Sequence, residues 1–309
     1  MGYLFLSLSV ISGAIKGFFA KKISDKTVGL KSAVLSNLIR MLFCIPIGLL
    51  FVVFDGGLTS LRIPQNVVWN ILLSGISTSA FIVSWLLAVQ KSAYTSMDAF
   101  LSMGILVPIL LSCLFYQEGV SLSQLIGLIL LLGSVVVMSL YNKQIKEKTS
   151  LGAALLLAFV GMANGFTDFS QKMFTNNGAN TPVSVFSFYT YVVSAVVLCA
   201  FFFCLKEKKQ LAQQQDEKGE KEEKTAILDK QKLIYIAVMA LFLFCNSYFK
   251  TLAAGRLSAV QLYPLSQGSA MMLSLLMSAI FFKEKIKPLC IVGMAVLFIG
   301  LLFLNVFSF

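Results

Sequence analysis

The sequence predicts an all-α integral membrane protein in which ten transmembrane helices form two inverted five-helix repeats. Of its 309 residues 58% are hydrophobic and 13% are charged, whereas about 25% of the residues in a soluble domain are charged. An apolar run of about 18 residues or more can cross about 30 Å of hydrocarbon as a helix. Ten runs meet that description: 2–20, 32–54, 67–89, 93–116, 122–141, 150–170, 183–205, 233–254, 258–282 and 288–308.

A duplicated stretch is the second observation behind this fold class. Residues 88–127 recur at a constant shift of 166, so that Ala88 matches Ala254 and Glu118 matches Glu284. Upstream, Gly13 and Gly17 recur at a shift of 148 as Gly161 and Gly165. Five helices per copy is an odd number, so the second copy must enter the membrane from the opposite side. We therefore expect repeat 1 at 1–144 and repeat 2 at 145–309.

The connections between the ten runs predict the orientation. Those after the first, third, fifth, seventh and ninth runs carry most of the lysines, whereas the opposite face has only Arg62, Lys172 and Arg256. Basic loops stay on the cytoplasmic side. We expect the lysine-rich connections to be cytoplasmic, both termini to be outside, and the protein to be a multi-pass protein of the plasma (inner) membrane.

One connection, 206–232, is a long hydrophilic insert rich in Lys, Glu and Gln. Such a composition cannot bury apolar area and predicts a disordered or loosely helical cytoplasmic loop. Two interpretations stay open for it, a solvated tether and a binding site for a partner.

Composition also excludes several classes of function. The net charge of +11 lies in short loops, where membrane orientation explains it better than nucleic-acid binding does. The six cysteines lie in apolar runs without CxxC spacing, and the chain has no histidine. We therefore predict no disulfide framework, no metal site, no cofactor and no catalytic residues.

Five charged residues lie inside the apolar runs, where each charge costs about 2.5–3.5 kcal/mol on insertion scales. We hypothesise that Arg40 and Asp98 form an inner gate while Asp168 and Lys250 form an outer one, each closing as the other opens. The fifth is Lys16. Alternatives stay open: Lys16 could extend its amine to the interface, Asp98 could stabilise a helix start, and Asp168 and Lys250 could cap their helices.

Neutral polar and aromatic side chains are the other candidates for binding a solute. An amide offers donors and acceptors without the cost of a charge, and an aromatic ring can stack on a solute, although packing is the simpler explanation for a single ring. Asn164 stands at the repeat position of Lys16, on the face of its Gly-x-x-x-Gly pair, so the first and sixth runs are the preferred wall of a cavity. The candidates are Asn37, Asn164, Asn246, Gln267, Tyr189, Tyr263 and Trp85.

Small residues four positions apart let helices approach closely in lipid. Gly13 with Gly17 and Gly161 with Gly165 therefore predict close helix packing, and the same faces could also slide during a conformational change. Pro108 and Pro264 each remove one helix hydrogen bond.

With these motifs the chain resembles the drug/metabolite transporter superfamily, with two EamA-type repeats. The resemblance rests on Gly13 and Gly161, on Arg40, on the run at 103–118 (MGILVPILLSCLFYQE), and on Gly127 and Gly293, nine residues after the terminal Glu of each copy. It implies a ten-helix secondary transporter with a central cavity between its halves.

We therefore expect a secondary active transporter of a small organic solute, such as a metabolite, an amino-acid-like compound or a drug. Alternating access would be coupled to protons or to exchange, with Asp98 or Asp168 as the proton carrier, and lipid would be the other partner. The excess of basic over acidic residues in the runs leans toward an anionic or zwitterionic solute. A scaffold or channel subunit without saturable transport, or an intramembrane enzyme, is the alternative, and the solute, direction and oligomeric state stay open.

Overall fold

A computed structural model describes residues 1–24, 30–90, 101, 103–140, 151–178, 181–205, 230–281 and 288–305. Its elements are helical throughout these residues. They are α1 (Gly2–Ser24), α2 (Leu30–Asp55), the 3-10 helix η1 (Leu58–Leu61), α3 (Gln65–Gln90), α5 (Leu106–Tyr116), α6 (Leu122–Leu140), α7 (Leu151–Asn177), α8 (Val183–Cys204), α9 (Lys230–Ala254), α10 (Ala259–Phe281) and α11 (Pro288–Asn305).

The all-α membrane fold expected from the sequence is confirmed. Within the described part of the chain, five helices are long and apolar enough to cross a membrane: Gly2–Ala20, Leu30–Asp55, Gln65–Trp85, Val183–Cys204 and Lys230–Ala254. Shorter apolar helices cover Leu106–Tyr116, Leu122–Ser134 and Ile291–Asn305.

The fourth expected run, 93–116, is helical only in part where it is described. Residues 101, 103 and 104 are helical, a turn follows at Ile105, and α5 starts at Leu106. Pro108 is the third residue of α5, where its missing N–H costs no helix hydrogen bond. The proline therefore lies in the first turn of a new helix segment.

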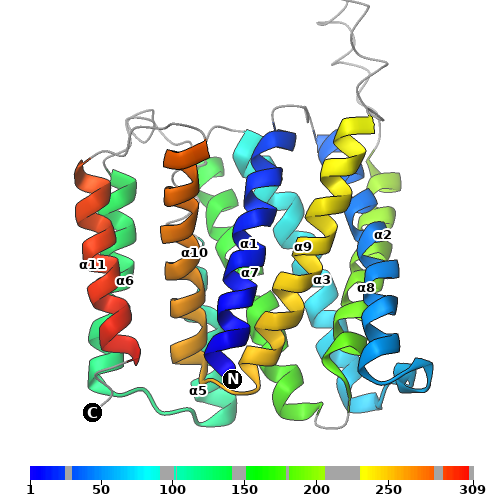
Figure 1. Cartoon of the computed structure of the whole chain (residues 1–309), viewed down its shortest axis with the longest axis horizontal. Helices are drawn as coiled ribbons and strands as arrows, with labels where there is room; N and C mark the ends of the chain where they lie inside the picture. The colour runs from blue at the N-terminus through cyan, green and yellow to red at the C-terminus, as the bar shows by residue number, and fades with distance from the viewer. Residues whose placement is uncertain are drawn as a thin grey trace, which may run out of the picture.

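The two repeats run in opposite directions, as the odd number of helices per copy requires. In Figure 1, α1 rises from the end of the bundle that carries the N-terminus, whereas its repeat counterpart α7 descends toward that end. The last residues of α1, α3, α6, α8 and α10 lie at the upper end of the view, together with the first residues of α2, α7, α9 and α11.

Helices of one repeat pack mainly on helices of the other. The principal pairs are α1 with α9, α3 with α7, α2 with α8, and α6 with α11, and the next contacts include α5 with α7 and α10 with α1. Each mixed pair has its symmetry partner, because α1 and α7, α3 and α9, and α5 and α10 are repeat counterparts. The bundle is thus one interlocked body, and any rearrangement between the repeats must break contacts between them.

Two close helix contacts depend on glycine. A Cβ at Gly104 or at Gly165 would collide with the backbone of the facing segment, at Gly161 and Gly104 respectively. At the edge of the bundle, a Cβ at Gly127 would lie 2.7 Å from the carbonyl oxygen of Gly300. The predicted packing role of Gly161 and Gly165 is therefore observed, whereas Gly300 was not anticipated.

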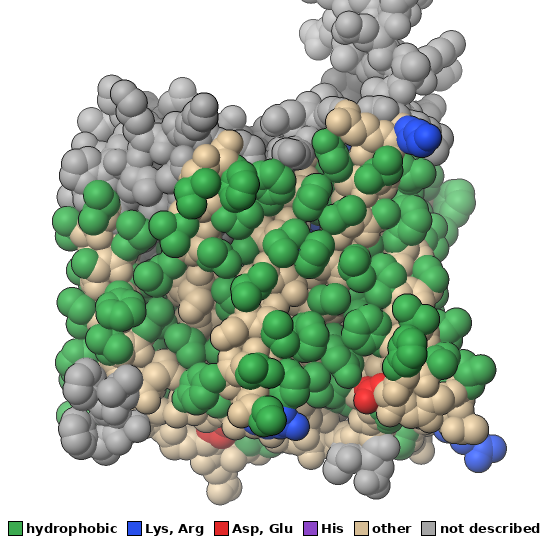
Figure 2. All heavy atoms as spheres, in the orientation of Figure 1, with side chains coloured by type: hydrophobic (Ala, Val, Ile, Leu, Met, Phe, Trp, Pro, Cys, Tyr) green, Lys and Arg blue, Asp and Glu red, His purple; other side chains and the backbone are tan. Residues whose placement is uncertain are grey.

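The surface of the bundle is apolar around its middle. Figure 2 shows hydrophobic side chains over most of the visible face, with charged side chains almost only toward the two ends of the helices. Large apolar side chains that would be buried in a soluble protein are exposed here, as expected for contact with lipid. They include Leu4, Phe54, Trp69, Leu114 and Phe203, each more than half exposed.

Candidate functional site

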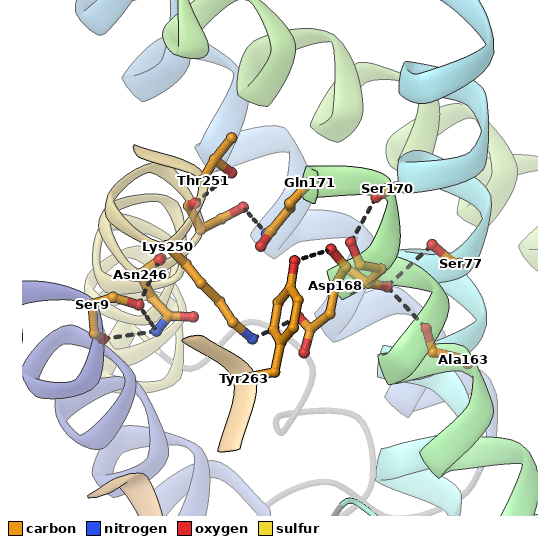
Figure 3. Close-up of polar contacts among 12 residues, drawn as sticks. Ser9, Ser77, Ala163, Asp168, Ser170, Gln171, Asn246, Lys250, Thr251 and Tyr263 are labelled. Carbon is orange, nitrogen blue, oxygen red and sulfur yellow. Dashed lines mark hydrogen bonds and ion pairs between the residues drawn. The ribbon is translucent and has the colours of Figure 1, made fainter. Parts of the chain in front are cut away.

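A buried ion pair joins α7 to α9. The Nζ atom of Lys250 lies 2.5 Å from Oδ1 of Asp168, and the Asp168 side chain is almost fully shielded. Figure 3 shows Lys250 extending from α9 toward Asp168 on α7, with the Tyr263 ring beside the contact. The structure thus brings together the two residues of the expected outer pair, and neither acts merely as a cap of its own helix.

Tyr263 of α10 braces this ion pair. Its hydroxyl donates a 2.6 Å hydrogen bond to the backbone oxygen of Asp168, and Lys250 Nζ lies 5.4 Å from the centre of its ring. A desolvated cation over an aromatic face gains about 2 kcal/mol. Three helices of the second repeat therefore meet at one polar contact in the interior.

A second ion pair lies nearer the end of the bundle, and the sequence analysis did not select it. Lys172 Nζ lies 2.7 Å from Glu118 Oε1 and also donates hydrogen bonds to the carbonyl oxygens of Ala254 and Leu257. The other carboxylate oxygen of Glu118 accepts the N–H of Ala259 at 2.7 Å. We refer to Glu118, Lys172 and the N–H of Ala259 as the end clamp.

The end clamp fastens the segment after α5 to α7 and to the junction between α9 and α10. It therefore ties the first repeat to the second. A signal for it was present in the sequence, since Lys172 is one of only three basic residues on its face and Glu118 ends the duplicated motif. Sequence spacing alone could not show that the two meet.

Lys16 and Arg40 lie on the side of the Asp168–Lys250 pair that is farther from the end clamp. At 1.5 Å per residue, Lys16 is about 12 Å from the end of α1 and Arg40 about 15 Å from the start of α2, both measured from the same end of the bundle. Lys16 interacts electrostatically with Arg40, Lys250 and Asp168. It therefore lies close enough to both Arg40 and the ion pair to interact with each.

Neither Lys16 nor Arg40 has a carboxylate partner among the residues that the structure describes. Arg40 is only 7% exposed, yet its Nε finds no acceptor there. Asn37, one helical turn earlier on α2, is 5% exposed, and its Nδ2 lacks an acceptor as well. Within the part of the chain that the structure describes, these two buried donor atoms on one helix are thus left without hydrogen bonds.

Further polar side chains continue this interior between the repeats. Gln171 donates to Ser247 Oγ at 3.3 Å, and Thr167 donates to Ser77 Oγ at 3.1 Å. The Oε1 atom of Gln171 has no partner in the described part of the chain. None of these four was selected from the sequence, since Ser, Thr and Gln recur in most membrane helices.

The remaining amide candidates differ in their surroundings. Asn246 is engaged with α1, because its Nδ2 donates to the backbone oxygen of Ser9 at 2.7 Å and to Ser9 Oγ at 3.0 Å. Gly13 leaves space for this amide, since a Cβ there would lie 2.9 Å from Asn246 Nδ2. Asn164 and Gln267 are half-buried on α7 and α10. Asn246 thus fastens α1 to α9.

Two aromatic candidates lie apart from the ion pair. Tyr189 donates to the backbone oxygen of Leu61 at 3.1 Å and so anchors η1 to α8. Trp85 packs against apolar clusters that include Ile236 and Ala88. For both residues the packing interpretation fits the structure. Asp98 lies outside the described residues, and with it the expected inner pair.

These features define a class of protein: a multi-pass helical membrane protein with inverted repeats and charged residues in its interior. A model of the EamA-like transporter family matches residues 1–140 and 144–306. The chain therefore belongs to the EamA-like transporter family, whose members are membrane transporters of small solutes and not enzymes.

Solved structures agree on the fold. A crystal structure titled only "Crystal structure of protein" superposes with a TM-score of 0.73, covering 99% of this chain and 97% of that chain at 12% sequence identity. At this identity the likeness shows the fold alone. No match is found among curated proteins.

Proposed function

We propose that this protein is a secondary active transporter that moves a small organic solute by alternating access, coupled to protons or to exchange. The observation that carries the proposal is the buried Asp168–Lys250 ion pair between α7 and α9. Charges in a membrane interior are costly and are retained where they line a pathway or act as a switch. In a family of transporters, a gate is the simplest role for such a pair.

The two ends of the bundle support a cycle with alternating closures. By their positions along α7 and α9, the Asp168–Lys250 pair and the end clamp both lie in the half of the bundle nearer the N-terminus, and the end clamp lies closer to its end. Opening this end would separate Lys250 from Asp168 and release Glu118 from Lys172. Arg40 with Asp98 would close the other end at that point, and Asp168, once unpaired, would be the group that takes up a proton.

The orientation follows from the basic residues. We propose that the end where α1 finishes and α9 begins faces the cytoplasm, because the lysine-rich connections, including 206–232, belong to that end. In the conformation described here, with both ion pairs formed, the protein would then be closed to the outside. A reporter active only in the cytoplasm, fused to either terminus, should stay silent; activity at both termini would reverse the orientation.

The experiment that tests transport has two stages. Thermal unfolding of the detergent-purified protein against a broad solute panel identifies compounds that bind the native state, since these raise the midpoint. Uptake of each hit into proteoliposomes is then measured with and without a pH gradient. Saturable uptake that Asp168→Asn abolishes is the expected result.

A matched control is Asp55→Asn, which neutralises an exposed carboxylate at the end of α2. It should leave uptake unchanged, although Tyr248 lies 3.4 Å from this carboxylate. Uptake without saturation would favour a channel subunit, and absence of both binding and uptake across the panel would favour a scaffold.

A further inference from the structure

The cations inside the helical bundle differ between the two repeats in whether they are paired with a carboxylate. Lys172 and Lys250, on α7 and α9, each hold a carboxylate at 2.7 Å or less. Lys16 and Arg40, on α1 and α2, have none among the described residues, although they interact electrostatically with each other. Two positive charges that are close enough to interact, and that form no ion pair among the described residues, repel one another in a membrane interior, and an anion between them would relieve that repulsion.

The hydrogen-bonding groups around these two charges agree with an anion. Arg40 Nε and Asn37 Nδ2 are donors, both are buried, and both lack an acceptor in the described structure. A buried donor without an acceptor carries the full cost of its desolvation. A cationic ligand would add a third positive charge and satisfy neither donor, whereas an anionic oxygen satisfies both.

Resting on the proposed function, we propose that Lys16, Arg40 and Asn37 form the binding site for an anionic group of the transported solute, a carboxylate or a phosphate. The planar guanidinium of Arg40 matches either oxyanion. Lys16 supplies the second charge and lies close enough to the Asp168–Lys250 pair to interact with it. The rest of the solute would extend along the polar side chains of α7 and α9, toward Gln171 and Ser247.

The location also suggests how binding reaches the outer gate. Lys16 interacts with both Lys250 and Asp168. An anion that neutralises Lys16 and Arg40 removes positive charge near Lys250, and it repels the Asp168 carboxylate. Occupancy of the site thus changes the electrostatic balance of the pair that we propose as a gate.

The test compares anions with neutral analogues of the same shape. The probes are succinate against succinamide, glutamate against glutamine, glucose 6-phosphate against glucose, and inorganic phosphate alone. Dissociation constants come from the rise of the unfolding midpoint of the full-length protein. We expect at least one anion to bind while its neutral analogue does not.

Variants then assign the binding to the site. Arg40→Gln and Lys16→Gln should each weaken the anion by about tenfold or more, because a hydrogen bond to a charged group is lost. Arg40→Lys, which keeps the charge, should weaken it less. Arg62→Gln is the control: it removes an exposed positive charge, so it changes the net charge by the same amount, and it should leave anion binding unchanged.

The outcomes separate this inference from the transport proposal. Anion binding that survives both Lys16→Gln and Arg40→Gln, or a panel in which no anion binds, overturns the site. If Arg40→Gln does not fold, Lys16→Gln and Arg40→Lys decide alone. Saturable uptake of a neutral or cationic solute without anion binding keeps the transporter and rejects the site. Anion binding that depends on Arg40, without any uptake, keeps the site and rejects the transporter.

Discussion

The repeat-related helices α1 and α7 share a motif but use it differently. Gly165 of α7 packs so closely on the segment around Gly104 that no side chain would fit, whereas its counterpart Gly17 on α1 has no atom of the described residues within 4 Å of a built Cβ. Between the glycines, α1 carries Lys16 where α7 carries Asn164. The glycine face of α7 is thus a packing face, whereas the glycine face of α1 leaves space near Lys16.

The charged residues extend the same contrast. On the second repeat, each of the two buried lysines is neutralised and hydrogen-bonded, so those contacts hold helices together. On the first repeat, Lys16 and Arg40 are left without carboxylates in the part of the chain described. The two repeats thus differ in whether their interior cations are paired with a described carboxylate.

Breaking the end clamp should have the largest effect on stability. Lys172→Met leaves the partly shielded carboxylate of Glu118 without its cation, and losing one partner of a largely buried ion pair costs up to about 3–5 kcal/mol. The unfolding midpoint in detergent should fall strongly. The double variant Lys172→Met with Glu118→Gln should lose less than the sum of the single variants, and additive losses would show that the two residues act independently.

Breaking the Asp168–Lys250 pair should affect transport more than stability. Lys250 is less shielded than Lys172, so Lys250→Gln should lower the free energy of unfolding by only about 1–3 kcal/mol. Uptake should fall by about tenfold or more, because the outer closure loses its ion pair. The exchange of the two residues, Asp168→Lys with Lys250→Asp, should restore part of the uptake, and full activity in Lys250→Gln would contradict the gate.

The glycine contrast can be tested with one substitution on each helix. Gly165→Ala forces α7 away from the Gly104 segment and should destabilise the protein by about 1–3 kcal/mol. Gly17→Ala meets no described atom and should be neutral or stabilising by up to about 1 kcal/mol, since alanine favours the helix. Equal unfolding midpoints for the two variants would remove the distinction between the faces.

Arg40→Gln should have the smallest effect on stability, and unlike the loss of either ion pair it should not lower the unfolding midpoint. Without ligand, Arg40→Gln removes a buried charge that has no carboxylate partner among the described residues, so we expect the midpoint to stay level or rise by the equivalent of about 1 kcal/mol. Lys172→Met is the comparison, because it removes a lysine whose charge is paired with Glu118. A large fall in stability for Arg40→Gln would mean that this arginine is part of the packing and not a site left open.

Much of the fold could be predicted from the sequence because membrane insertion leaves few alternatives. A backbone in hydrocarbon must satisfy its own hydrogen bonds, so apolar runs read directly as helices. The constant shifts of 166 and 148 predict a duplication, and an odd helix count predicts inversion. For the same reason, Asp168 and Lys250 could be selected as candidates, since a charge in an apolar run is conspicuous.

Only the tertiary structure decided which charges meet. Lys172 and Glu118 are 54 positions apart, and both lie next to the ends of apolar runs where charges are common. Asn246 looked like a solute ligand, yet it is engaged by Ser9 across α1 and α9. A one-dimensional pattern gives depth and helical face but not the rotation of one helix against another. That rotation leaves Lys16 and Arg40 without a described carboxylate while Lys172 and Lys250 are paired.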